Sequence, residues 1–427
     1  MIRLFRSAAA KLWAASMLAL ILFGIGVGAA RLGLPWVEEL RPEAEALAAG
    51  LFDVPVEIGG LRARLRGLTP ELELQRVRLL DPDTRLPQLA FRTLRVSVAP
   101  LDSLLRGALH FGDITLAGAR LTLGRLPDGR LGLRGLRASN RDPLDLIRPL
   151  LRDGRVQLRE SELLLELGPG PGVLLEDLEL AIRNHGERHQ LEGQAQVGGR
   201  PGARLSFAAD LKGRLAAAAR FNGDFYLKAA ELPLPALAGL FLSGPYRAEA
   251  GSLELELWGR LEGFRLQRLD GRLRLADLAL AVNGEPRRRW STERLDTGLD
   301  WQRRGQGWRL DLTRLQLHRG PTRWPGSRLA FAYAGGAAEA SRLDVGADRL
   351  PIAELASALA LAPLPAEIHA ALSGAAPRGA LQGLQLRLYP GAETPRWQAR
   401  GRILGFSSRP WERLPGVTGL TLGFAAG

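Results

Sequence analysis

Leucine occupies nearly every second position in long stretches of this chain, and charged residues often stand between the leucines. The clearest case is residues 253–282, LELELWGRLEGFRLQRLDGRLRLADLALAV. A period of two is typical of a β-strand, whose side chains point alternately to its two faces. Each strand therefore has one apolar and one polar face. Up to Leu275 the leucines of this stretch fall mostly on odd-numbered positions, and after it they fall on even-numbered ones; we call this a change of apolar parity. A bulge or tight turn at Ala276 and Asp277 would keep the leucines on one face.

The alternating pattern starts at Val54 and continues to the end of the chain. Turn signals divide it into strands; the N-terminal ones are at Gly59-Gly60, Thr69-Pro70, 81–83, 117–118 and 127–129. Short helices are predicted over 36–51, 100–107, 140–154, 233–242 and 351–361. Helices do not alternate regularly with strands, so we expect a mainly β fold with an antiparallel sheet.

The N-terminal region predicts a membrane anchor. Residues 12–30, LWAASMLALILFGIGVGAA, contain no charge and would span roughly 28 Å as a helix, near the thickness of a hydrocarbon core. Basic residues precede this segment and acids predominate after it, so the N-terminus is expected in the cytoplasm and the body in the periplasm. A cleaved signal peptide is the alternative, but the apolar run is longer than usual for one. The anchor residues are Leu12, Trp13, Leu18, Leu20, Ile21, Leu22, Phe23 and Ile25.

The expected organisation has four parts: a cytoplasmic basic tail over 1–11, a transmembrane helix over 12–30, an amphipathic helix next to the membrane over 31–52, and a periplasmic β region over 53–427. The last strand-like segment ends at Gly427 without a cap. An uncovered sheet edge favours aggregation, so we expect the natural protein to continue.

Composition narrows the possible functions. The 427 residues carry a net charge of +13, almost entirely from arginine, and contain no cysteine. Disulfides and cysteine-based metal or redox sites are thereby excluded. The arginines are spread along the chain, as expected for the polar faces of strands, and no platform of aromatic and basic residues indicates nucleic-acid binding. Binding to an anionic polymer is a lesser alternative.

Residue patterns for catalysis or metal binding are weak. His185 and His189 have the spacing of a helical metal pair, but RNHGERHQ reads as a hairpin turn. The Asp81–Asp83 segment lacks the further acids of a calcium loop, and GPGPG lacks the lysine of a phosphate loop. We therefore predict no enzyme, no metal and no cofactor.

The leucine faces remain as the candidate functional feature. They could close into β-sandwich cores, or one curled sheet could leave an apolar groove open for an acyl chain, which needs only a dry wall worth about 0.8 kcal/mol per buried CH₂. Periodicity alone does not separate these alternatives.

The order of segments resembles the YhdP branch of the AsmA-like proteins. The anchor is followed by LRPEAEALAAGLFDVPVEIGGLRARLRGLTPELELQRVRLLDP and then by APLDSLLRGALHFGDITLAGARLTL, as in that branch. GWRLDLTRLQLHRGPTRWPGSRLAFAY and PWERLPGVTGLTLGFAAG are similar to later family segments. Members of the branch are much longer, so the chain would be an N-terminal fragment of one.

The resemblance implies an elongated, curled antiparallel sheet with a hydrophobic groove, anchored in the inner membrane. The implied function is passive carriage of phospholipid between the inner and outer membranes. We expect one-face leucines to line the groove, namely Leu253, Leu255, Leu257, Leu273 and Leu275. Arg31 and Arg41 could contact anionic head groups at the membrane, and outer-membrane or other envelope proteins are possible partners. The alternative is an envelope scaffold or assembly factor with a closed β-sandwich body, which transports nothing.

Overall fold

The computed structural model forms two compact units, described here separately. Unit 1 comprises Met1–Leu164 and Asp177–Glu187, and unit 2 comprises Leu165–Glu176 and Arg188–Gly427. The structure describes residues 38–52, 54–66, 69–81, 84–85, 87–98, 111–125, 131–134, 153–166, 172–200, 202–213, 221–241, 244–263, 265–283, 288–335, 341–390, 396–412 and 415–427.

Unit 1 contains a helix and a sheet. Its elements are α2 (Arg41–Phe52), β1 (Val56–Arg66), β2 (Thr69–Leu80), β3 (Pro87–Val98), β4 (Phe111–Ala117), β5 (Arg120–Arg125), β6 (Leu131–Arg134), β7 (Asp153–Glu166) and most of β8 (Val173–His185). The pairs β1–β2, β2–β3, β3–β4 and β5–β6 are antiparallel, whereas β4 and β7 are parallel. The helix α2 confirms the helix expected just before the strands.

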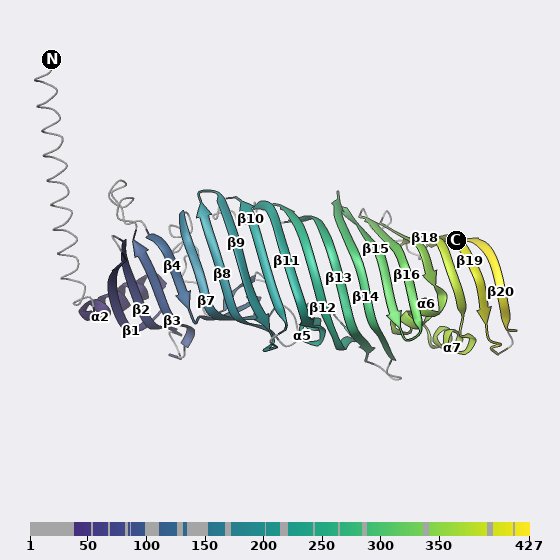
Figure 1. Ribbon diagram of the computed structural model, residues 1–427, viewed down its shortest axis with the longest axis horizontal. Helices are drawn as coiled ribbons and strands as arrows, with labels where there is room; N and C mark the ends of the chain where they lie inside the picture. The colour runs from purple at the N-terminus through teal and green to yellow at the C-terminus, as the bar shows by residue number, and fades with distance from the viewer. Residues whose placement is uncertain are drawn as a thin grey trace, which may run out of the picture. The chain divides into compact units, whose positions relative to one another are not determined.

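Unit 2 is a meander in which each strand pairs with the next along the chain (Figure 1). Its strands are β9 (Arg188–Val197), β10 (Arg204–Lys212), β11 (Asn222–Pro233), β12 (Tyr246–Glu262), β13 (Arg265–Val282), β14 (Arg288–Arg304), β15 (Gly307–Arg319), β16 (Thr322–Ala334), β17 (Arg342–Pro351), β18 (Arg378–Tyr389), β19 (Arg396–Ser408) and β20 (Val417–Ala426). All of these pairings are antiparallel, so the predicted mainly β, mostly antiparallel fold with few short helices is confirmed.

The described helices of unit 2 are all attached at the same end of its strands. They are α5 (Leu234–Phe241) between β11 and β12, and α6 (Ile352–Ala358), the 3₁₀ helix η4 (Leu359–Leu361) and α7 (Ala366–Ala375) between β17 and β18. Figure 1 shows them at the lower ends of the strands. The helices expected over 233–242 and 351–361 are thereby confirmed.

Several strands of unit 2 contain a β-bulge between their two ends. Asp277 has φ of +49°, and the register of β12 with β13 shifts beside it, which confirms the predicted bulge. Glu231 and Arg314 have the same left-handed conformation, and the ladders of β11 with β12 and of β15 with β16 shift next to them. Each bulge adds one residue to one strand, so leucines of both parities reach the same face.

One turn prediction is wrong. Gly59 and Gly60 lie inside β1, which pairs with β2 on both sides of them. The glycines instead mark the place where the apolar parity of β1 changes from Val56 and Ile58 to Leu61.

Several predictions fall outside the described residues, which begin at residue 38: the anchor over 12–30 with its eight named residues, Arg31, and the helices over 100–107 and 140–154. In the part of the chain that is described, no helix combines the length and the apolar character needed to cross a membrane.

Candidate functional site

The five leucines predicted as groove wall lie on one face of β12 and β13. Leu253 pairs with Leu275, Leu255 with Leu273, and Leu257 with Gly271. Directly opposed residues of antiparallel strands point to the same face. The structure therefore brings all five together, as the alternation predicts; their role in lipid binding stays a prediction.

The apolar face of these leucines crosses every strand of unit 2. One cross-strand row, read by register from β9 to β20, contains no charged, hydroxyl or amide side chain. Its members are Leu191, Ala209, Phe225, Gly259, Leu269, Trp301, Leu310, Phe331, Val345, Leu386, Ala399 and Ala426. We call this face of the sheet the trough.

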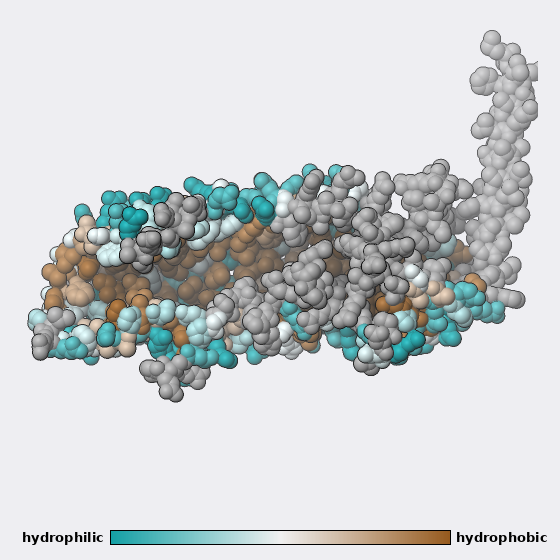
Figure 2. Space-filling model, turned by 180° about the vertical axis from the view of Figure 1, so that it is seen from behind, coloured by the Kyte–Doolittle hydropathy of each residue, from teal (hydrophilic) through white to brown (hydrophobic). Residues whose placement is uncertain are grey.

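The trough is hollowed and open. Figure 2 shows a band of hydrophobic residues set between two polar borders on the part of the molecule that carries the later strands. Leu255, Leu257, Leu273 and Leu275 are only half-buried, whereas Leu253 is buried beside the helical end. Within the described ranges, no second sheet packs on this face. A closed sandwich would have buried these leucines completely.

One margin of the trough is covered by helices. At these strand ends Trp290 and Trp324 are buried in a cluster with Leu278, Leu317 and Leu350, and Ile352, Leu355 and Leu361 of α6 and η4 pack against the cluster. Polar contacts tie the helices down: Arg319 Nη1 lies 3.3 Å from the buried carboxylate of Glu354. Arg288 Nη1 donates to the carbonyl of Ala362 at 2.7 Å. We call this the covered margin.

The opposite ends of the strands carry no described helix; we call this side the open margin, formed by the hairpins β10–β11, β12–β13, β14–β15, β16–β17 and β18–β19. Its outermost trough-facing row runs from Arg303 through Trp308, Tyr333, Leu343 and Leu388 to Trp397. The rings of Trp308 and Tyr333 lie with centroids 6.2 Å apart. Trp397 is 47% exposed. Aromatic rings at this margin are thus partly in contact with solvent.

The other face of the sheet in unit 2 is polar and held by ion pairs between strands. Arg274 bridges Glu254 at 2.8 Å and Asp296 at 2.7 Å, across three strands. Burial acts to raise the pKa of Asp296, but hydrogen bonds from Arg294 and Arg274 outweigh it and hold that pKa below its usual value. The hydrogen bond from Arg309 likewise lowers the pKa of Asp311. These carboxylates stay charged at neutral pH and face away from the trough.

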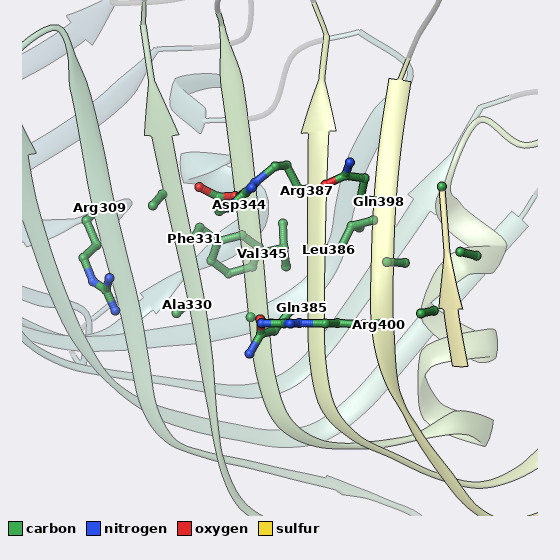
Figure 3. A pocket seen from close by; sticks show the side chains of 16 residues that line it. Arg309, Ala330, Phe331, Asp344, Val345, Gln385, Leu386, Arg387, Gln398 and Arg400 are labelled. Atoms are coloured by element: carbon green, nitrogen blue, oxygen red, sulfur yellow. Dashed lines mark hydrogen bonds and ion pairs between the residues drawn. The ribbon is translucent and has the colours of Figure 1, made fainter. Parts of the chain in front are cut away.

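A hollow of about 810 Å³ lies across β15–β20 and is lined by members of the apolar row, such as Phe331 and Val345, and by polar residues of the neighbouring rows (Figure 3). The polar residues that line it come from the two cross-strand rows next to the apolar row that contains Phe331 and Val345. Figure 3 shows Arg387 beside Asp344, at 2.7 Å, and Arg400 alongside Gln385. The lining of this hollow is therefore mixed, with guanidinium, carboxylate and amide groups beside apolar side chains.

The two histidines of the predicted hairpin lie in different environments. His185 is exposed at the end of β8, whereas His189 is buried, with Nε2 3.1 Å from the carbonyl of Gly213 and its ring edge-on to Phe221. No group of three metal-ligating side chains occurs among the described residues. The absence of enzymatic activity stays a prediction.

The aromatic residues of the open margin were not predicted from the sequence. The segment DWQRRGQGW holds the signal, since it places Trp301 and Trp308 on either side of a two-arginine hairpin. Its meaning depends on knowing which ends of the strands stay uncovered, which periodicity does not give.

Comparison with known protein families identifies a match. The sequence model of the family described as YhdP protein matches residues 1–426. No curated protein and no solved structure matches the chain.

Proposed function

Because the chain belongs to the YhdP protein family, we propose that its trough carries the acyl chains of phospholipids between the inner and outer membranes. The anchor over 12–30 would hold the N-terminus in the inner membrane, with the body in the periplasm. Arg31 and Arg41 would lie where the chain leaves the membrane, within reach of anionic head groups.

The uninterrupted apolar row is the observation that supports this proposal most. An acyl chain has no directional group, so it needs a wall that is apolar at every step and free of competing hydrogen-bonding side chains. The row from Leu191 to Ala426 meets this requirement over all strands of unit 2. A protein core would have the same composition, but its leucines would be fully buried rather than half-buried.

The energetics of such a wall suit carriage. Each CH₂ that leaves water contributes about 0.8 kcal/mol, so a chain of ordinary length is held firmly without any specific contact. Moving along the wall exchanges one leucine for the next at nearly constant burial. Passive sliding of this kind requires no catalytic residue.

The first experiment is mass spectrometry of lipid that co-purifies with the full chain. Phospholipid bound in stoichiometric amounts is expected in the wild-type protein. The absence of any bound lipid under mild extraction would contradict the proposal and favour the envelope scaffold.

A pair of variants tests the wall itself. Leu255→Glu places a carboxylate on the half-buried face and should reduce bound lipid at least fivefold, with the far-UV circular dichroism spectrum unchanged. Ala332→Glu places the same charge on the polar face, in register with Arg309 and Asp344, and should leave bound lipid as in the wild type. If Leu255→Glu unfolds the protein, the leucines form a core and the trough does not exist.

A further inference from the structure

We propose that the open margin is the head-group side of the trough, where Arg303 binds the phosphate of the lipid and Trp308 and Tyr333 contact its glycerol ester region. This inference rests on the proposed function of the trough. It assigns the phosphate-bearing head group to one margin and to named residues.

Two successive trough-facing rows at the open margin match the polar and the apolar part of a phospholipid. Arg303 directly opposes Trp308, and Trp308 opposes Tyr333, so the three point to the trough side of the sheet. One step further into the trough the row consists of Trp301, Leu310 and Phe331. A row that combines a cation with two amphipathic rings is thus followed, one step deeper, by a row of aromatic and aliphatic wall. Trp and Tyr prefer such boundaries because one part of the ring is apolar and the other carries a hydrogen-bonding group.

Arg303 has no carboxylate partner among the described residues, unlike three arginines of the polar face. Arg260, Arg268 and Arg274 each pair with an aspartate at 2.8 Å or less. Arg303 is exposed at the hairpin end with Arg304 beside it. An uncompensated guanidinium can bind a phosphate through two parallel N–H···O hydrogen bonds.

The covered margin lacks this arrangement. Its tryptophans Trp290 and Trp324 are buried under α6 and η4, and the indole N–H of Trp324 already donates to Ser327 Oγ at 2.7 Å. Arg288 and Arg319 at this side are engaged by the helical segment through Ala362 and Glu354. A head group would have to displace the helices to reach these residues.

The test compares two fluorescent lipids with identical acyl chains, phosphatidic acid and diacylglycerol, which differ only in the phosphate. Both are titrated into the purified full chain. The wild type should bind phosphatidic acid about tenfold more tightly, the order of one charge-assisted contact. Arg303→Glu should remove this preference and leave diacylglycerol binding unchanged. Arg303→Gln should lie between the two.

Arg200→Glu is the matched control. Arg200 is an exposed arginine in the β9–β10 turn, at the strand ends opposite to the open margin, and it has no carboxylate partner among the described residues. Its variant should keep the wild-type preference for phosphatidic acid. Equal affinity of the wild type for the two lipids, or equal loss of both in Arg303→Glu, would overturn the head-group assignment while the trough stands. A wild type that binds neither lipid would overturn the proposed function itself.

Discussion

The two margins of the trough in unit 2 are built from similar residues but have opposite environments. Both carry tryptophans and arginines close to the strand ends. At the covered margin Trp290 and Trp324 are each 9% exposed, whereas Trp397 at the open margin is 47% exposed. The difference comes from the helices that connect β11 to β12 and β17 to β18. The same residue types therefore serve as core on one side and as a boundary to water on the other.

This asymmetry indicates how an open apolar face can be stable. A single sheet with one uncovered apolar side exposes surface that favours aggregation. Here the covered margin concentrates burial in one cluster, and ion pairs on the polar face tie neighbouring strands together. We therefore expect the stability of the sheet to depend less on the open margin than on the covered margin.

The largest expected contrast between the margins is in stability after loss of a tryptophan. Trp324→Ala removes a buried ring and the hydrogen bond to Ser327, so the free energy of unfolding should fall by about 3–5 kcal/mol. Trp397→Ala should cost under about 1 kcal/mol, because half of that ring is already in water. Urea denaturation followed by far-UV circular dichroism measures both. Equal losses would mean that the open margin is also core.

A smaller contrast is expected for acidic residues at the two margins. Glu354 is buried in α6 and pairs with Arg319, so Glu354→Ala should destabilise the protein by about 1–3 kcal/mol. Hydrogen exchange should increase first in α6. Glu262→Ala, at an exposed position in the β12–β13 hairpin of the open margin, is the control and should change stability by under about 0.5 kcal/mol. An unaltered α6 in Glu354→Ala would show that the pair does not hold this helix.

Replacing a glycine at a bulge between the margins is expected to lower the free energy of unfolding by about 1 kcal/mol. Gly383 in β18 has φ of +62° with open space where a Cβ would lie, so Gly383→Ala should destabilise by backbone strain alone. Gly346 in β17 has similar room and no positive φ, so Gly346→Ala should be neutral or slightly stabilising. The measurement is the urea midpoint of each variant. The bulge would be irrelevant if both substitutions had the same effect.

The sequence predicts the faces of this fold better than its margins. Alternation placed Leu253, Leu255 and Leu273 on one face because the side-chain period of a strand is fixed by its backbone. The parity change after Leu275 located the bulge at Asp277 for the same reason. Gly59 and Gly60 misled the turn prediction, because a glycine pair suits a parity change inside a strand as well as a turn.

The open and covered margins depend on contacts between distant segments. Ile352 and Leu355 look like any short amphipathic stretch, and only the structure places them against Trp324 and Leu317. Trp308 and Trp324 have similar local sequences, each next to arginine, yet their environments differ because the helices that the structure describes cover the strand ends beside Trp324. Local patterns do not carry this information, so the head-group side could not be predicted from them.

The smallest expected effect is a decrease of stability at acid pH. It comes from ion pairs on the polar face of the sheet, around Asp311. Asp311 accepts from Arg309 and Arg328 at 2.5 and 2.7 Å, and the hydrogen bond from Arg309 is the main cause of a pKa below the usual value of 3.8. A carboxylate with a lowered pKa in the folded state contributes stability above its unfolded pKa, and this contribution is lost as the pH falls through the folded value. The urea midpoint of the wild type should therefore decrease from pH 5 to below pH 3.8. Asp311→Asn should lower the midpoint at pH 7 and make this decrease shallower.

Trp324→Ala, which acts at the covered margin, should lower the midpoint equally at both pH values. If Asp311→Asn shows the full wild-type decrease, other carboxylates dominate the acid response and the ion pairs of Asp311 do not stabilise the sheet.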